Sequence, residues 1–399
     1  MAKKRSTAFL YSIASDRLRQ KRERSPVYVA NGRARKEWTA LLYSVARDLY
    51  VDMFSLKQCR LCVLNWFAKL WEIEKSEYWG YVTNGGTEGN LYGILLGREL
   101  YPDGVLYISK ESHYSLLKIA RISRVKCVIV GTRPSGEIDY DELKASLLAH
   151  QDKPAIVNLN LGTTIKGGID DLDLVPQILK DCGFTQERFY IQCDAALFGM
   201  MLPFINGALQ ISFKKPIGSV TVSGHKFLGC PIPCGVLITH LNYVELLSRE
   251  VEYIASRDTA ISGSQGGHAS IFLWYVPDKR GFNGLQDVNE CINKAIYLQN
   301  CLKGYGIGVM LNKFSNIIVF ERPLDDAFGH KWILVNEGKM SGIVVLQHVT
   351  MEMLDSFVTE FVENPLIWYQ DNEGKKAPCI AKDICAKNCA CSSHKKLIS

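Results

Sequence analysis

Short apolar runs alternate with longer helical segments through the middle of this 399-residue chain, and this alternation constrains the fold more than any other feature. The runs are too short for helices and are predicted to be β-strands. They lie at Val105–Ser109, Val125–Val130, Ala155–Leu161, Arg188–Cys193, Ser219–Val222 and Gly235–Thr239. Strands that alternate with helices favour a mostly parallel α/β sheet with helices on both faces, which binds ligands at the carboxyl ends of its strands.

One lysine comes just after such a strand end. The alternating run Ser219–Val222 is followed by Ser223, Gly224, His225 and Lys226. A lysine amine held in the low dielectric of a protein interior is readily neutral and can attack a carbonyl carbon, which is the chemistry of Schiff-base catalysis. The alternative is an ordinary exposed loop lysine, which is the commoner case for a single lysine.

A glycine-rich loop leads into a helical run upstream of these strands. Residues 81–90 contain Gly85, Gly86 and Thr87, and an apolar helical pattern follows at Leu91–Leu100. A glycine-rich turn that opens a helix directs backbone N–H groups and the positive end of the helix dipole at one point, which suits a phosphate. The alternative is an ordinary helix N-terminus at which Thr87 is only a cap.

Further polar residues follow other strand ends. His113 comes after the first predicted strand, Thr163 and Thr164 after the third, and Asp194 directly after the fourth. Together with the glycine-rich loop and Lys226, they supply a phosphate anchor, a ring-contacting surface, an acid and an amine, which are the four functions that pyridoxal phosphate requires. The alternatives are a core or loop histidine and a helix-capping aspartate.

The segments around these positions form a set of motifs that covers most of the chain. They are Tyr81–Asn84 with Gly86–Asn90, Glu111–Ser115, Gly162–Thr164 with Asp170–Asp173, Cys193–Ala196, Ser223–Lys226 with Gly229–Pro231, Ala255–Asp258, and Phe272–Tyr275. In these motifs the chain, from about residue 60 onward, resembles the group II pyridoxal-phosphate decarboxylases, and the plant serine decarboxylases among them. The resemblance implies an α/β enzyme of aspartate-aminotransferase type (fold type I), with a mostly parallel sheet in a large domain and a smaller α+β C-terminal domain.

The resemblance implies a role for each residue beside the cofactor ring. Lys226 would hold pyridoxal phosphate covalently through its aldehyde until a substrate amino group displaces it. Asp194 would pair with the pyridinium nitrogen, while His113 would stack on one face of the ring and Ala196 would pack beneath it. Thr164 would lie near the ring hydroxyl. The catalytic candidates are Lys226, His113 and Asp194.

The resemblance also implies a phosphate site and a reaction. Gly86, Thr87, Ser223 and His225 would contact the phosphate, and no metal is expected. The reaction would be the decarboxylation of a small L-amino acid, with serine, which would give ethanolamine and carbon dioxide, ahead of histidine.

Members of this fold dimerise with active sites at the interface. The resemblance therefore implies a homodimer, in which the loop around Ser262–His268 would serve the partner's site. Two departures from the family pattern are evident: Gly85 stands where the plant proteins usually have cysteine, and no family match is recognised upstream of Val63. Because of the second departure, an alternative interpretation remains: the chain is an inactive or truncated paralogue that has kept the fold.

The patterns divide the chain into four parts. They are a basic N-terminal segment at 1–60, a cofactor-binding large domain at 61–256, a small domain at 257–365 and a cysteine- and lysine-rich tail at 366–399. Further expected elements are a helix from Cys62 to near Trp79, a helix at Tyr243–Ser256, strands at Ser315–Phe320 and Ser341–Leu346, and a helix at Met351–Glu363.

The distribution of charge bears on which partners the protein could bind. The net charge is +6, and residues 1–36 carry eleven lysines and arginines against two acidic residues. Such a head could bind nucleic acid, an acidic membrane surface or an import receptor but is more often a solvated arm, so neither nucleic acid nor membrane is expected as a partner. No apolar run approaches the roughly 18 residues needed to cross a bilayer.

The thirteen cysteines favour a reducing compartment. They are odd in number, and Cys127, Cys193 and Cys234 lie in apolar runs, which fits the buried thiols of a cytoplasmic protein. In the tail the spacing of the possible zinc ligands is irregular, which favours a flexible tail over a zinc site. These ligands are Cys379, Cys385, Cys389, Cys391 and His394.

Overall fold

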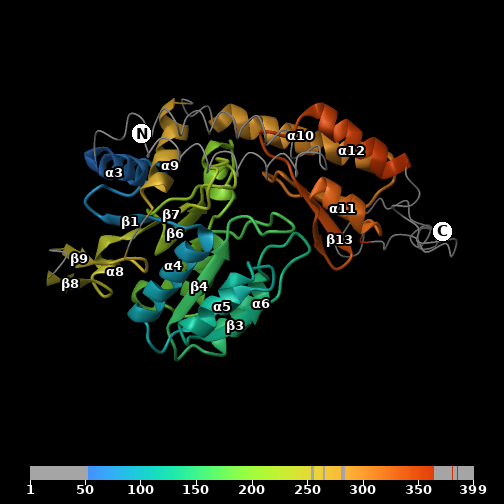
Figure 1. Ribbon diagram of the computed structural model, residues 1–399. Helices are drawn as coiled ribbons and strands as arrows, with labels where there is room; N and C mark the ends of the chain where they lie inside the picture. Colours follow the sequence, from blue (N-terminus) through green and yellow to red (C-terminus); the bar gives the residue numbers. More distant parts are fainter. Residues whose placement is uncertain are drawn as a thin grey trace, which may run out of the picture.

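The computed structural model describes residues 53–252, 256–263, 266–279 and 284–363, together with Ile380 and Ile384. Figure 1 shows a large sheet flanked by helices and, beside it, a smaller layer of strands and helices from the C-terminal part of the chain. The basic head and most of the tail, with the proposed zinc ligands, lie outside the described residues.

The large sheet has seven strands in the order β1-β7-β6-β5-β4-β2-β3. Their bounds are β1 Tyr78–Thr83, β2 Val105–Ser109, β3 Lys126–Val130, β4 Ala155–Asn160, β5 Phe189–Asp194, β6 Ser219–Ser223 and β7 Gly235–His240. Strands β2 to β6 are parallel, while β7 runs antiparallel to both β6 and β1. The prediction of a mostly parallel α/β sheet is confirmed, and β4, β5 and β6 are buried along their whole length because both faces are covered.

Helices cover both faces of this sheet. Their bounds are α3 Met53–Leu70, α4 Gly86–Leu100, α5 Ser115–Ile122, α6 Tyr140–Leu148, α7 Leu174–Asp181, α8 Leu241–Val244, α9 Gly267–Lys279 and α10 Gly284–Gly304. One face packs α3, α6, α7 and α9 into a core that includes Phe67, Leu143 and Phe272. The other packs α4, α5 and α8, with Tyr92 and Leu116 in its core. The parallel strand ends therefore stay accessible at one edge of a well-packed sheet.

Three local predictions were wrong. The residues read as a loop before Asn84 form β1, and the following helix begins at Gly86 rather than at Leu91. The helix expected at Tyr243–Ser256 is instead the short α8 followed by a two-stranded hairpin of β8 Arg249–Val251 and β9 Ser256–Asp258. The first long helix ends at Leu70 instead of near Trp79, since Tyr78 is already paired with β7.

The C-terminal elements form a second, antiparallel sheet in the order β10-β11-β13-β12. Their bounds are β10 Val309–Leu311, β11 Ile317–Glu321, α11 Asp326–Trp332, β12 Val335–Glu337, β13 Met340–Val344 and α12 Met351–Glu363. One core joins α10, α11 and α12 to this sheet through Phe320, Phe357 and Phe361. The predicted helix Met351–Glu363 and the two predicted strands are confirmed within a few residues. The four-part division of the chain remains a proposal.

Two residues of the tail pack against this small sheet. Ile380 and Ile384 are buried and form a cluster with Val319, against which Met310 and Met340 pack. The prediction of a flexible tail is therefore wrong for these two positions, where the hydrophobic effect favours burial on the sheet.

None of the helices within the described residues combines the length and apolar character that a membrane span requires. The same residues contain no group of three or more histidine, cysteine, aspartate or glutamate side chains able to hold a metal ion. Their nine cysteines are free thiols.

Candidate active site

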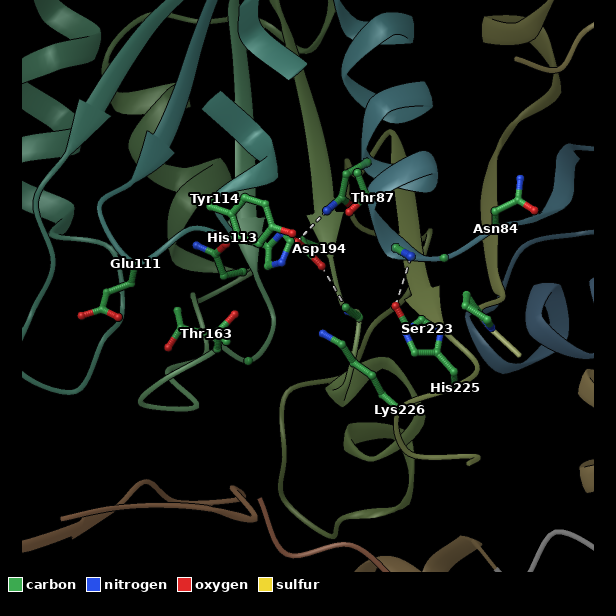
Figure 2. Close-up of a pocket in the computed structure, with 18 residues that line it drawn as sticks. Asn84, Thr87, Glu111, His113, Tyr114, Thr163, Asp194, Ser223, His225 and Lys226 are labelled. Carbon is green, nitrogen blue, oxygen red and sulfur yellow. Dashed lines mark hydrogen bonds between the residues drawn. The ribbon is translucent and has the colours of Figure 1, made fainter. Parts of the chain in front are cut away.

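All nine residues predicted for the site line one cavity of about 260 Å³ at the carboxyl ends of β4, β5 and β6. They are Gly86, Thr87, His113, Thr164, Asp194, Ala196, Ser223, His225 and Lys226. They come from five separate segments of the chain, which the sheet brings to one edge (Figure 2). We call the wall formed by Gly86, Thr87, Ser223 and His225 the α4 side, and the wall formed by Glu111, His113, Thr163 and Thr164 the loop side.

The α4 side is a helix N-terminus set against a strand end. Gly85, whose φ of 134° suits glycine, turns the chain so that α4 begins at Gly86. The Gly86 N–H donates to Ser223 Oγ at 3.1 Å, and a Cβ at position 86 would lie 2.8 Å from that oxygen. Glycine therefore allows the helix N-terminus to approach the end of β6, where the first-turn N–H groups and the helix dipole favour an anion.

Further glycines bring α4 directly onto the sheet. A Cβ at Gly89 would lie 2.4 Å from Thr221 Cγ2, and one at Gly93 would lie 2.0 Å from Gln192 Oε1. Any larger side chain at these positions would separate the helix from β5 and β6. The position of the helix N-terminus relative to Lys226 therefore depends on these close contacts.

Asp194 ends β5, lines the cavity and is only 7% exposed. Its Oδ2 accepts a hydrogen bond from Asn90 Nδ2 at 2.6 Å, and its Oδ1 accepts one from the Ala196 N–H at 3.2 Å. Asn90 is held in turn by Gln192, whose Nε2 donates to Asn90 Oδ1 at 3.1 Å. Both hydrogen-bond donors to this buried carboxylate are neutral groups, so its negative charge is available to a cation in the cavity.

His113 lies on the loop side, with its Nδ1 2.7 Å from Ser115 Oγ. Burial lowers the pKa of His113, the nearby Asp194 carboxylate opposes this shift, and the Lys226 and Lys118 ammonium groups add to it. The imidazole is therefore neutral at neutral pH. A neutral, half-buried ring provides a flat apolar surface at this wall.

The two neighbouring threonines of the loop side have different environments. Thr163 is buried, and its Oγ1 accepts a hydrogen bond from the Gly168 N–H at 2.9 Å, which closes the loop after β4. Thr164 is exposed and lines the cavity. Only Thr164 therefore has a side chain free to contact a ligand.

Lys226 lies in the loop after β6 and lines the cavity. Within the described residues its ammonium group has neither a hydrogen bond nor an ion pair, and Figure 2 shows its side chain pointing into the space beside Asp194. Its amine is therefore available for a bond to a ligand.

A family model for the pyridoxal-dependent decarboxylase conserved domain matches residues 42–306, which include every residue described in this cavity. The chain belongs to the pyridoxal-dependent decarboxylase family. The match begins at residue 42, within the N-terminal segment for which the sequence motifs gave no assignment. The interpretation that the chain has no family match upstream of Val63 was therefore wrong. This decarboxylase is a pyridoxal-phosphate-dependent carboxy-lyase that acts on an amino acid.

Two plant proteins are similar to this decarboxylase along most of its length. Serine decarboxylase 1 of Oryza sativa subsp. japonica is 55% identical over 341 residues, which is 85% of this chain and 70% of the rice protein. The histidine decarboxylase of Solanum lycopersicum is 52% identical over 345 residues, which is 86% of this chain and 83% of the tomato protein.

Solved structures share the fold of this decarboxylase. The crystal structure of the L-methionine decarboxylase from Streptomyces sp. 590 aligns with a TM-score of 0.70 and 23% sequence identity, and the alignment covers 78% of this chain and 84% of that chain. Fold type I is therefore confirmed.

The cavity of this decarboxylase fits pyridoxal phosphate. The α4 side offers N–H groups to an anion, the buried Asp194 carboxylate offers a charge to a protonated ring nitrogen, and Lys226 offers an amine to an aldehyde. The cavity-lining residues to which sequence reasoning gave no role include Asn90, Glu111, Tyr114, Asn160 and Pro233. A polar residue inside a predicted apolar run was a usable signal for Asn160. Asn90, Glu111 and Tyr114 lie within motif segments named above, but those motifs gave them no role of their own.

Proposed function

We propose that this decarboxylase converts serine to ethanolamine and carbon dioxide. The observation that carries the proposal is its similarity to three rice serine decarboxylases, which are 50 to 55% identical to it over about 340 residues each. In the reaction the bond from the α-carbon to the carboxylate breaks, the carboxylate leaves as carbon dioxide, and a proton takes its place on the α-carbon.

The α4 side is proposed to hold the cofactor phosphate. Backbone N–H groups of Gly86 and Thr87 at the start of α4, the Thr87 hydroxyl, Ser223 and His225 would contact it. The hydrogen bond from Gly86 to Ser223 Oγ supports this role, because it brings the helix N-terminus and the β6 end to one point.

The remaining predicted residues are proposed to hold and orient the cofactor ring. The neutral ring of His113 would stack on one face, Ala196 would pack against the other, and Thr164 would hydrogen bond near the ring hydroxyl. Asp194 would keep the ring nitrogen protonated, which its burial and its neutral hydrogen-bond donors support. Pyridoxal phosphate, when bound, accepts the electron pair that the departing carboxylate leaves behind.

Lys226 is proposed to bind the cofactor aldehyde through Nζ and to release it to the substrate amino group. Its position at the end of β6, with the amine pointing into the cavity, supports this assignment. The residues on both sides of the ring would then keep the breaking bond oriented for the electron transfer.

Histidine is the second candidate substrate. The observation in its favour is the 52% identity to the tomato histidine decarboxylase, which is close to the identity shared with the rice serine decarboxylases.

A homodimer and a cytoplasmic location are further parts of the proposal. Tyr114 lines the cavity although it is 70% exposed, and Leu117 beside it on α5 is also exposed, which supports a wall completed by a second copy of the chain. The segment that would reach the partner is attached to α4 through Ser262 Oγ, which donates to Glu88 Oε1 at 3.2 Å. The nine cysteines of the described residues are free thiols, which supports a reducing compartment.

The test is a substrate panel with the purified, cofactor-loaded protein. Carbon dioxide release and amine formation are measured for serine, histidine and other amino acids, with and without residues 1–50, and the oligomeric state is measured by sedimentation. The proposal expects serine to have the highest kcat/KM. Faster turnover of histidine than of serine would make histidine the substrate in place of serine. Binding of the cofactor without turnover of any amino acid would favour the inactive paralogue.

A further inference from the structure

A nearly buried ion pair lies at the edge of the cavity. Lys166 Nζ is 3.0 Å from Glu111 Oε1, and the two side chains are only 9% and 12% exposed. The ion pairs of Lys214 with Glu72 and of Arg322 with Asp326 are much more exposed. A surface pair has little energetic consequence, whereas removing one partner of a buried pair leaves an uncompensated charge.

The ion pair joins the two loops that form the loop side. Glu111 lies in the loop after β2, two residues before His113, and lines the cavity. Lys166 lies in the loop after β4, two residues beyond Thr164. These loops are 55 residues apart in sequence, and the pair connects them directly beside the cavity.

The backbone at Lys166 is also fixed to the small sheet. Asn312, which follows β10, donates through Nδ2 to Lys166 O at 2.9 Å and to Ser135 O at 2.6 Å. The stem of the lysine packs closely on Gly136, where a Cβ would lie 2.9 Å from Lys166 Cβ. Lys166 therefore contacts the small sheet through its main chain and the cavity wall through its ammonium group.

We propose that Lys166 is a positioning residue of the decarboxylase, which holds Glu111, and with it the His113 loop, at the spacing from Thr164 that the cofactor ring requires. The proposal rests on the proposed roles of His113 and Thr164. Because Asn312 of the small domain donates to the Lys166 carbonyl, Lys166 also couples the position of the small sheet to the distance between the two loops of the cavity wall. A displacement of the His113 ring by about 1 Å is enough to impair an oriented reaction.

The test compares a broken pair with a pair from which both charges have been removed. Lys166→Met leaves the Glu111 carboxylate unpaired, the double variant Glu111→Gln with Lys166→Met removes both charges, and Lys166→Arg keeps the ion pair. Lys214→Met, the same change in an exposed pair, is the matched control. For each protein we would measure kcat, KM, the cofactor dissociation constant, the melting temperature and hydrogen exchange of residues 110–116 in the cofactor-free state.

A positioning role gives a distinct pattern of results. Lys166→Met lowers kcat about 10- to 100-fold with little change in KM, weakens cofactor binding and speeds exchange in residues 110–116. The double variant recovers the melting temperature but neither kcat nor the slow exchange, while Lys166→Arg stays within a few-fold of wild type. If Lys166→Met does not fold, the double variant and Asn312→Ala carry the test, and Asn312→Ala shows a weaker form of the same losses.

Two results would overturn the proposal. One is a kcat and an exchange rate in Lys166→Met that match those of Lys214→Met. The other is recovery of kcat together with the melting temperature in the double variant, which would mean that the pair serves stability alone. Failure of the wild-type protein to turn over any amino acid would instead count against the proposed function, and hydrogen exchange in the cofactor-free protein would still decide the role of Lys166.

Discussion

The α4 side and the loop side of the cavity are built in different ways. On the α4 side, Gly86, Gly89 and Gly93 bring one helix into direct contact with β5 and β6, and the wall is a continuous piece of the sheet core. On the loop side, His113 and Thr164 lie in separate loops, which the pair of Glu111 and Lys166 holds together. The first wall depends on close packing, while the second depends on polar contacts between loops, among them the buried ion pair and the hydrogen bond from Asn160 Nδ2 to Ser109 Oγ, so different substitutions should disturb them.

The largest expected effect comes from Lys226→Ala, which removes the amine beside the α4 side. We expect decarboxylation to fall by about three orders of magnitude or more, because the covalent attachment of the cofactor is lost. Activity and the visible absorbance of the cofactor-loaded protein are the measurements, with Lys214→Ala, at an exposed ion pair, as the control. An unchanged absorbance in Lys226→Ala would refute the assignment of this lysine.

Asp194→Asn tests the buried carboxylate that lines the cavity. We expect some cofactor to remain bound and kcat to fall about 100-fold, because a neutral amide no longer stabilises a protonated ring nitrogen. The measurements are kcat and the cofactor dissociation constant, with the exposed Asp173→Asn as the control. Full activity of Asp194→Asn would exclude the proposed role.

Gly93→Ala tests whether the α4 side depends on packing. The added methyl group would overlap Gln192 Oε1, so the free energy of unfolding should fall by about 1–3 kcal/mol and cofactor binding should weaken. Gly304→Ala, at the end of α10 with no heavy atom within 4 Å of the added Cβ, is the control and should change little. Urea unfolding measures both variants, and equal stabilities would contradict a packing-dependent wall.

The smallest expected effect is on the pH dependence of stability through His113 on the loop side. The pKa of this histidine is lower in the folded protein than its ordinary value of 6.5, so the folded state binds fewer protons than the unfolded state as the pH falls below that value. The free energy of unfolding therefore decreases through this window, and His113→Phe should make the decrease shallower. Urea unfolding between about pH 7.5 and 5.5 measures the difference from wild type, which removes the contributions of other histidines. Parallel curves would contradict the lowered pKa.

The fold and the family could be predicted from local patterns. Apolar or alternating runs of four to seven residues, separated by helical segments, predicted six of the seven large-sheet strands, because strands of a covered sheet bury most of their side chains. The strand missed was β1, which contains Trp79 and Gly80 between two tyrosines and leads directly into the glycine-rich turn. The start of α4 at Gly86 was also missed, since glycine is unfavourable inside a helix by about 1 kcal/mol. Close packing of Gly89 and Gly93 on the sheet overrides that preference.

The sequence by itself determined which residues stand at the strand ends, and therefore that Asp194, Lys226 and the start of α4 would meet at one edge of a parallel sheet. Only the tertiary structure decided what surrounds them: the hydrogen bond from Asn90 to Asp194 and the ion pair from Lys166 to Glu111. The reason is physical. A strand end follows from the periodicity of its own neighbours, whereas each of these contacts joins side chains 55 or more residues apart and exists only where the packed sheet brings them within reach.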